Sequence, residues 1–222
     1  MKYSNHNGFT LIELMIAMVI GSILMAAVVG AYQIQVRSKN AQEAITDINS
    51  SARAALEIMT SELSAAGCDP EGTAGAGIIT AEVDNLIFSM DIGNTAGTSF
   101  QPDGLLDGPN EIVRYALIAG TLGRATGAAG VLQPLVRNVD VLDFVYLNEA
   151  GGIAATLATI RAVEVSIVAR SGQGSPGSRM RTVDNTSYLN LQDVEILAPP
   201  NDSIRRVLLT TSVNCRNLGV GP

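Results

Sequence analysis

The feature that most constrains the fold of this chain is an apolar run from Phe9 to Tyr32, close to the first methionine. About 20 consecutive apolar residues are enough for a helix to span a bilayer. The run contains one charged residue, Glu13, in its first turns. A carboxylate inside a membrane segment is costly and usually marks a functional position. The sequence therefore predicts a membrane-spanning helix with a functional acid near its start.

The segment before the run, Met1 to Gly8, is short and polar. An ordinary secretory signal places its small-residue cut site after the apolar core. Here the small residue, Gly8, comes before the core, so an ordinary signal peptidase site fits poorly. Arg37 and Lys39 follow the run and Lys2 precedes it, so the charges give only a weak orientation signal. A plain signal anchor, with Glu13 reaching the membrane interface, is the alternative.

The junction Gly8-Phe9-Thr10-Leu11-Ile12-Glu13-Leu14-Met15 resembles the cleavage site of type IV prepilins and pseudopilins. The resemblance implies that a prepilin peptidase cuts after Gly8 and methylates the new terminal amine of Phe9. It also implies that the Glu13 carboxylate pairs with the terminal amine of a neighbouring subunit in a filament core. The alternative for Glu13 is an unpaired or protonated side chain. The same resemblance places the leader in the cytoplasm and the C-terminus outside the inner membrane.

The composition excludes most kinds of catalytic site. His6 is the sole histidine and lies in the leader, so cleavage would leave a chain with none. This excludes nucleophilic sites that need histidine, and zinc sites built on it. Two cysteines are too few for a four-thiolate site, and no Walker loop is present. A two-carboxylate hydrolase stays formally open, but nothing places two acids on one rigid surface. We therefore expect no enzyme activity and no cofactor.

The charge argues against a nucleic-acid partner. The formal net charge is −7, and the basic residues beyond Lys39 are arginines spread along the chain. Proteins that bind duplex nucleic acid neutralise phosphates with clustered basic residues. We expect no nucleic-acid binding.

From Ala41 onward the apolar residues recur at steps of three or four, which is the helical period. They are Ala41, Ile45, Ile48, Ala52, Ala55, Met59, Leu63 and Ala66. The pattern predicts one helix from Phe9 to about Ala66, a rod of roughly 87 Å at 1.5 Å per residue. Gly67 is expected to end it, and Pro70 cannot continue it.

After Pro70 the pattern changes to strands bounded by Gly, Ser and Pro-rich loops. Strands are predicted at residues 85–91, 111–118, 131–135, 139–147, 161–169 and 206–215. The expected fold class is α+β, a long N-terminal helix packed on an antiparallel β-sheet domain, as in pilins. The predicted division is a leader (1–8), a membrane and filament-core helix (9–32), an amphipathic helix (33–67) and an exported β-rich domain (68–222).

Three later segments extend the resemblance. The helix end, Met59 to Pro70, fits minor pilins of the PilW kind. Leu135 to Tyr146 is similar to the middle strand region of PilW-type and GspJ-type proteins, and Arg205 to Leu218 to the last strand of PilW-like proteins. The resemblance therefore favours a PilW-like minor pilin over other members of the superfamily.

The resemblance places the domain in an oxidising compartment, where two cysteines are usually paired. Cys68 and Cys215 are therefore a candidate disulfide between the helix end and the last strand. Two separate thiols are the alternative.

One long loop is rich in oxygen-bearing side chains. They are Asp91, Asn94, Asp103, Asp107, Asn110 and Glu111. Such loops can bind calcium, and some pseudopilins do, so Asp91, Asp103 and Asp107 are weak calcium candidates. The spacing matches no EF-hand, and ordinary turns, which Asp and Asn favour, are the alternative.

These features predict a minor type IV pilin that is processed by prepilin peptidase and takes part in assembling or priming the pilus. The expected partners are other minor pilins, the major pilin, the inner-membrane assembly platform and, before assembly, membrane lipid. The expected location is the inner membrane and then the pilus, cell surface or periplasm. A GspJ-like pseudopilin of type II secretion and a pilus-tip adhesin are the alternatives.

Overall fold

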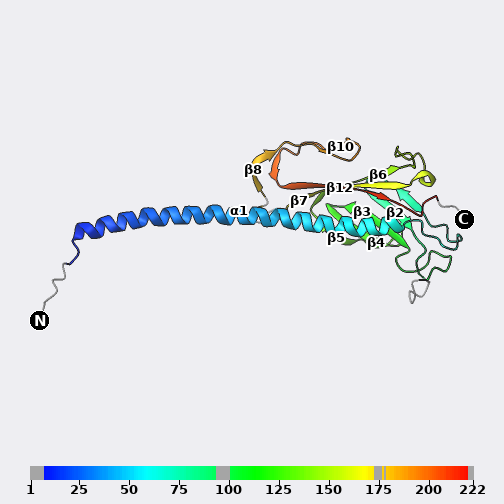
Figure 1. Cartoon of the computed structure of the whole chain (residues 1–222), viewed down its shortest axis with the longest axis horizontal. Helices are drawn as coiled ribbons and strands as arrows, with labels where there is room; N and C mark the ends of the chain where they lie inside the picture. Colours follow the sequence, from blue (N-terminus) through cyan, green and yellow to red (C-terminus); the bar gives the residue numbers. More distant parts are fainter. Residues whose placement is uncertain (1–7, 94–100, 173–176, 178, 220–222) are drawn as a thin grey trace.

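The computed structural model describes residues 8–93, 101–172, 177 and 179–219. A single helix, α1 (Leu11–Ala65), projects from a β-rich domain like a handle (Figure 1). Its 55 residues correspond to a rod of about 82 Å. The helix ends where Ala66 caps it and Gly67 takes a φ of 78°, a conformation that favours glycine. The predicted single long helix and its terminator are confirmed.

The two halves of α1 have different surroundings. Every residue from Gly8 to Lys39 is exposed, although this half is almost wholly apolar. From Ala44 onward one face is buried, comprising Ala44, Ile48, Ala52, Ala55, Leu56, Met59 and Leu63. Ile45, which the periodicity placed on this face, is instead 37% exposed. The first half of the helix therefore finds no partner within its own chain.

The β-domain contains two main antiparallel sheets. The five-stranded sheet has the order β1-β2-β3-β4-β5, and the three-stranded sheet has the order β12-β7-β6. Their bounds are β1 Ile78–Ala81, β2 Asn85–Ser89, β3 Ile112–Ile118, β4 Thr121–Thr126, β5 Gln133–Arg137, β6 Val139–Leu147, β7 Ala162–Arg170 and β12 Arg206–Asn214. A short 3₁₀ helix, η1 (Leu157–Thr159), precedes β7. The α+β prediction is confirmed, with two sheets where one was expected.

Helix α1 contacts an edge strand of each sheet, β12 and β5, and the central strand β7. The core lies between the helix and the inner faces of the sheets. Val163, Val165 and Ile167 of β7 are fully buried there, together with Met59 and Leu63 of α1. The alternation of apolar and polar residues in β7 thus turns its apolar face to the helix.

A long excursion, residues 179–204, joins β7 to β12. It contains β8 (Arg179–Asp184) paired with β11 (Asp202–Ile204), and β9 (Tyr188–Leu189) paired with β10 (Glu195–Leu197). Figure 1 shows the excursion above the three-stranded sheet, on the side away from α1. The outer, more polar face of β7 is therefore also covered, and Glu164 and Ser166 are buried.

The Arg206 network, as we call the charges around this arginine, holds the base of the excursion to the sheet. The side chain of Arg206 is 5% exposed, and its guanidinium donates to Asp140 of β6 at 2.6 Å and to Asp202 of β11 at 2.7 and 2.8 Å. Asp184 of β8 lies 3.7 Å away, and Arg170 pairs with Asp140 at 2.8 Å. One arginine therefore contacts carboxylates from three separate strands.

A second polar cluster joins α1 to the five-stranded sheet. The Glu62 carboxylate of α1 accepts from the Arg124 guanidinium, with nitrogen–oxygen distances of 2.7 and 3.0 Å, and from the Tyr115 hydroxyl. Burial and the Glu62 carboxylate raise the pKa of Tyr115 well above its usual range. The helix is thus fixed to β3 and β4 by bonds to a charged group, which are stronger than neutral ones.

We expect the substitution Glu62→Ala to lower the free energy of unfolding by about 2–3 kcal/mol, because it removes charged hydrogen bonds and leaves Tyr115 and Arg124 unpaired. Denaturant unfolding of the full chain in detergent would measure this. The matched control is Glu43→Ala, which breaks the exposed Lys39–Glu43 pair on the same helix and should cost less than about 0.5 kcal/mol. Equal losses for the two variants would contradict the assigned role of Glu62.

Candidate processing and assembly site

The predicted cleavage junction lies at the free end of the helix. Gly8 and Phe9 precede α1 and belong to no helix or strand, and Phe9 is 90% exposed. A Cβ atom added at Gly8 would meet no atom within 4 Å. The peptide bond after Gly8 therefore lies in an exposed segment, and no contact among the described residues requires glycine there.

Thr10 and Glu13 form a capping box at the start of α1. The Thr10 hydroxyl accepts from the Glu13 amide at 3.3 Å. In return, Glu13 Oε2 accepts from the Thr10 amide at 2.8 Å and from its hydroxyl at 2.9 Å. The first amides of a helix have no partners within the helix, so these bonds remove a cost that would be large in lipid. The negative carboxylate also lies at the positive end of the helix dipole.

This geometry gives Glu13 partners within its own chain. The carboxylate is not isolated in the single subunit, because Thr10 of the same chain already donates to it. Pairing with the amine of a neighbour, which stays a prediction, would have to add to or replace these bonds. Sequence reasoning missed Thr10, although the signal was present. The pattern T-x-x-E before an apolar run is a capping-box signature.

We expect Thr10→Val to weaken the start of the helix, because valine keeps the shape but cannot accept from or donate to Glu13. Loss of a capping side chain typically costs about 1 kcal/mol. Thr10→Ser keeps the hydroxyl and is the matched control. Amide hydrogen exchange in detergent would measure the result: faster exchange in the first turn of the Val variant, with the Ser variant close to wild type. Unchanged protection in the Val variant would count against the capping box.

The two cysteines contribute to the same core. Cys215 is buried within it, and Cys68, at the end of α1, packs against it. Both are free thiols in the structure. Burial raises the pKa of Cys215 to about 11, and burial with the nearby Asp91 and Asp69 charges raises the pKa of Cys68. Thiols with raised pKa react slowly at neutral pH. The disulfide stays a prediction, which thiol labelling of unreduced, denatured protein would decide.

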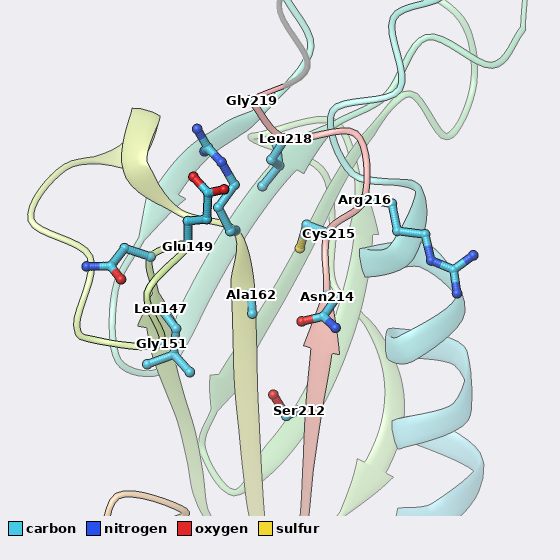
Figure 2. A pocket seen from close by; sticks show the side chains of 12 residues that line it. Leu147, Glu149, Gly151, Ala162, Ser212, Asn214, Cys215, Arg216, Leu218 and Gly219 are labelled. Atoms are coloured by element: carbon cyan, nitrogen blue, oxygen red, sulfur yellow. The ribbon is translucent and has the colours of Figure 1, made fainter.

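Cys215 also borders a pocket of about 480 Å³ at the end of the domain away from the membrane half of α1. Figure 2 shows it between the end of β12, with Ser212 and Asn214, and Leu218 and Gly219 of the C-terminal segment. The Arg161 guanidinium donates to the carbonyls of Ala158 and Ile160 at 2.8 and 2.7 Å. A Cβ atom on Gly219 would overlap that guanidinium. Arg161 therefore packs directly against the C-terminal segment at Gly219.

The acidic loop holds itself together through two buried carboxylates. Asp91 accepts from the amides of Asp103 and Gly104 at 3.3 and 3.0 Å. Glu111 accepts from the amides of Gly93 and Gly108 at 3.0 and 2.6 Å. These bonds use the carboxylates to organise turns, which was the alternative to calcium.

The structure describes only some of the other oxygen-bearing residues of this loop. Asp103 accepts from the Leu105 amide at 3.2 Å, and Asn94 lies outside the described residues. Asp107, which also has a polar or electrostatic interaction, lies in the same loop. Among the described residues, no group of three or more His, Cys, Asp or Glu side chains is placed to hold a metal ion.

Helix α1 is also long and apolar enough to cross a membrane, and none of its most apolar 18-residue stretch is buried in the structure. The apolar helix, with its accessible junction, indicates membrane anchoring.

Comparisons with known proteins agree with this geometry. Residues 3–29 match the prokaryotic N-terminal methylation motif. The structure is similar to that of a type IV-like pilin from Thermus thermophilus, with a TM-score of 0.52 and 15% sequence identity, over 77% of this chain and 97% of that one. At this identity the likeness concerns the fold alone. A search of curated proteins gave no match. The chain therefore carries a prepilin-type N-terminal methylation motif on a fold similar to that of a type IV-like pilin.

Proposed function

We propose that this protein is a minor type IV pilin of the PilW kind, a structural subunit that carries out no chemistry. It enters the inner membrane through α1, with its domain outside. Prepilin peptidase cuts after Gly8 and methylates Phe9. The subunit then joins other minor pilins and the major pilin in a complex that primes or caps the filament.

The main support for this proposal is the difference in burial between the two halves of α1. Its first half is apolar and wholly exposed, whereas its second half is packed into the domain. Exposed apolar surface of this extent is unstable in water and calls for a covering partner. Lipid before assembly and neighbouring helices in a filament would each supply one. The methylation motif at the start of the same helix supports this two-stage use.

The choice of a PilW-like subunit depends on the resemblance of Met59–Pro70, Leu135–Tyr146 and Arg205–Leu218. In the structure these segments form the end of α1, strands β5 and β6, and β12 with its C-terminal extension. They surround one core, so the resemblance covers the packed part of the domain rather than its loops. A GspJ-like pseudopilin shares the middle segment and is the nearest rival.

Mass spectrometry of sheared surface filaments would test the proposal. We expect a peptide that begins with N-methylated Phe9 in that fraction. The same cut peptide found only in membranes would favour a short secretion pseudopilus over a surface pilus. A peptide that still contains residues before Gly8, with no cut form, would overturn the proposal and leave a plain membrane anchor.

A further inference from the structure

Three arginines lie at the end of the domain where α1 leaves it. Arg37 is on the helix, Arg179 begins β8, and Arg205 directly precedes β12. The Nε atom of Arg205 donates to the carbonyl of Gly177 at 2.9 Å. A Cβ atom on Gly177 would lie 2.2 Å from the carbonyl oxygen of Asn40, so this glycine contacts the helix backbone. We call the three arginines the basic collar.

Strand pairing places Arg179 beside the other collar residues. In the β8–β11 ladder it lies opposite Ile204, the residue before Arg205. Figure 1 shows β8 at the end of the domain from which the membrane half of α1 extends. The collar therefore combines three segments that are far apart in sequence and meet beside the helix.

The collar carries positive charge that the domain does not neutralise. The salt bridges of the described residues involve none of the three collar arginines. Arg37 and Arg179 are exposed, and Arg205, which is half-buried, bonds a neutral carbonyl rather than a carboxylate. Within the described part of the chain, the three guanidinium groups are therefore left without an acidic partner.

The acids nearest the collar have other partners or lie further from the membrane half of α1. After its first turn the helix carries no acid until Glu43, which pairs with Lys39. Asp47 lies one turn further into the domain. Asp184 and Asp202 of the excursion belong to the Arg206 network. A partner that neutralises the collar must therefore come from outside the chain.

The length of α1 places the collar near the level of lipid headgroups. The apolar run ends at Tyr32, an aromatic residue of the kind enriched at membrane interfaces. Arg37 and Asn40 follow it by five and eight residues, or about 8 and 12 Å along the helix. The headgroup layer extends roughly 5–8 Å beyond the hydrocarbon core on each side, and long arginine side chains can reach back toward it. A membrane surrounds the helix, so this holds for every face of α1.

Orientation in the membrane does not account for the collar. Basic residues close to a membrane span favour the cytoplasmic side, whereas the proposed topology puts the collar on the exported side. The chain as a whole is acidic, with a formal net charge of −7. A group of unpaired arginines beside the membrane on such a protein fits attraction to an anionic lipid surface.

We propose that the basic collar binds the anionic headgroups of the membrane that α1 spans. Lipid phosphates accept from the guanidinium groups, which suit phosphate geometry better than lysine does. The contact holds the base of the domain on the membrane surface until the subunit enters a filament. This proposal rests on the proposed pilin function, because it requires a domain that stays anchored by α1 before assembly.

Tryptic cleavage of the full-length chain in lipid nanodiscs would test the contact, because trypsin cuts after arginine. Discs of phosphatidylcholine alone are compared with discs that also contain phosphatidylglycerol. In the anionic discs we expect cleavage after Arg179 to slow by about fivefold relative to cleavage after Arg216 in the same molecule. Arg216 is exposed at the end of β12 and reports any general effect of the lipid on the protease. High salt should remove the protection.

Substitutions on α1 would show whether the collar itself is responsible. Arg37→Gln should remove most of the protection after Arg179, because each arginine near an anionic surface contributes about fivefold. Arg37→Lys keeps the charge and should keep most of the protection. The matched control is Arg53→Gln, at a second exposed arginine of the same helix about 32 Å beyond Tyr32. It should leave the cleavage ratio unchanged.

Equal cleavage after Arg179 in the two kinds of disc would overturn the proposal. Protection that appears only when other pilin subunits are added would also overturn it, because a protein would then cover the collar. The two proposals can fail separately. Recovery of N-methylated Phe9 from filaments would leave the pilin function standing when the collar test fails, and an uncut chain would still present its collar to the nanodisc.

Discussion

Replacing Gly8 with tryptophan should abolish processing, leaving the full precursor in the inner membrane and none in filaments. In the proposed reaction the peptidase must accept residue 8 in its pocket, and glycine has no side chain to obstruct it. A folding effect is not expected, because a Cβ atom added at Gly8 would lie within 4 Å of no described atom and Gly8 precedes α1. Mass spectrometry of the N-terminal peptide from membranes and filaments would measure the cut and uncut forms.

Gly8→Ala is the matched control, since it adds a single methyl group to the same position. We expect it to be cut more slowly than wild type and faster than the tryptophan variant. Both variants should unfold at the wild-type denaturant concentration, because Gly8 lies outside α1 and the domain. Normal processing of Gly8→Trp would contradict the assignment of this junction as the cleavage site.

The substitution Arg206→Ala should be the most destabilising single change in the domain, at about 3–5 kcal/mol. Removing one partner of a buried ion pair leaves uncompensated charge. Here the loss removes the arginine from Asp184, which is 4% exposed, and from Asp202, and it leaves Asp140 paired with Arg170 alone. Arg206→Lys keeps the charge but loses the two-pronged contact with Asp202, so it should lie in between. Denaturant unfolding of full-length chains in detergent would rank the variants.

Arg216→Ala provides the matched control, because Arg216 is exposed at the end of β12. It should change the free energy of unfolding by less than about 0.5 kcal/mol. A small effect of Arg206→Ala, comparable to the control, would show that the network does not hold the excursion to the sheet.

The same network has a signature in the pH dependence of stability. The Arg206 guanidinium, through its hydrogen bonds, lowers the pKa of Asp202 to about 2. A carboxyl whose pKa is lower in the folded protein stabilises it above the unfolded pKa and loses that effect as pH falls toward the folded one. The stability difference between wild type and Asp202→Asn should therefore be present at pH 7 and shrink between about pH 4 and pH 2. A difference that does not change with pH would contradict the pairing.

The sequence predicted those parts of the fold that local patterns control. The continuous apolar run and the three-to-four periodicity after Ala41 predicted α1 to within two residues at its start and one at its end. The alternation of Val and Ile with other residues predicted β7. Successive side chains of a strand point to opposite faces, so every second residue faces the core. The N-terminal motif predicted the superfamily, since its chemistry is contained in a few adjacent residues.

Other parts depend on contacts between distant residues, which local patterns do not contain. Strand β4 was missed because Gly123 interrupts its pattern, yet a side chain there would lie 2.9 Å from Leu132. Strand β1 and the strands of the excursion were missed because they are short or polar and are fixed by their neighbours. The excursion in particular depends on Arg206, whose partners come from three strands. The capping role of Thr10 was readable from the sequence and was overlooked.

The position of α1 against β12 also has a consequence for how the chain folds. Helix α1 is the first element of the domain and β12 is the last strand. Their contacts therefore join residues that are separated by almost the whole sequence of the domain. Contacts between residues far apart in sequence form slowly, because a long loop must be ordered before they contribute. Until residues 206–214 pair with β7, the core between α1 and β7 is not covered by β12. In the proposed topology, with the domain outside the membrane, the domain would be complete only after residues 206–214 have crossed.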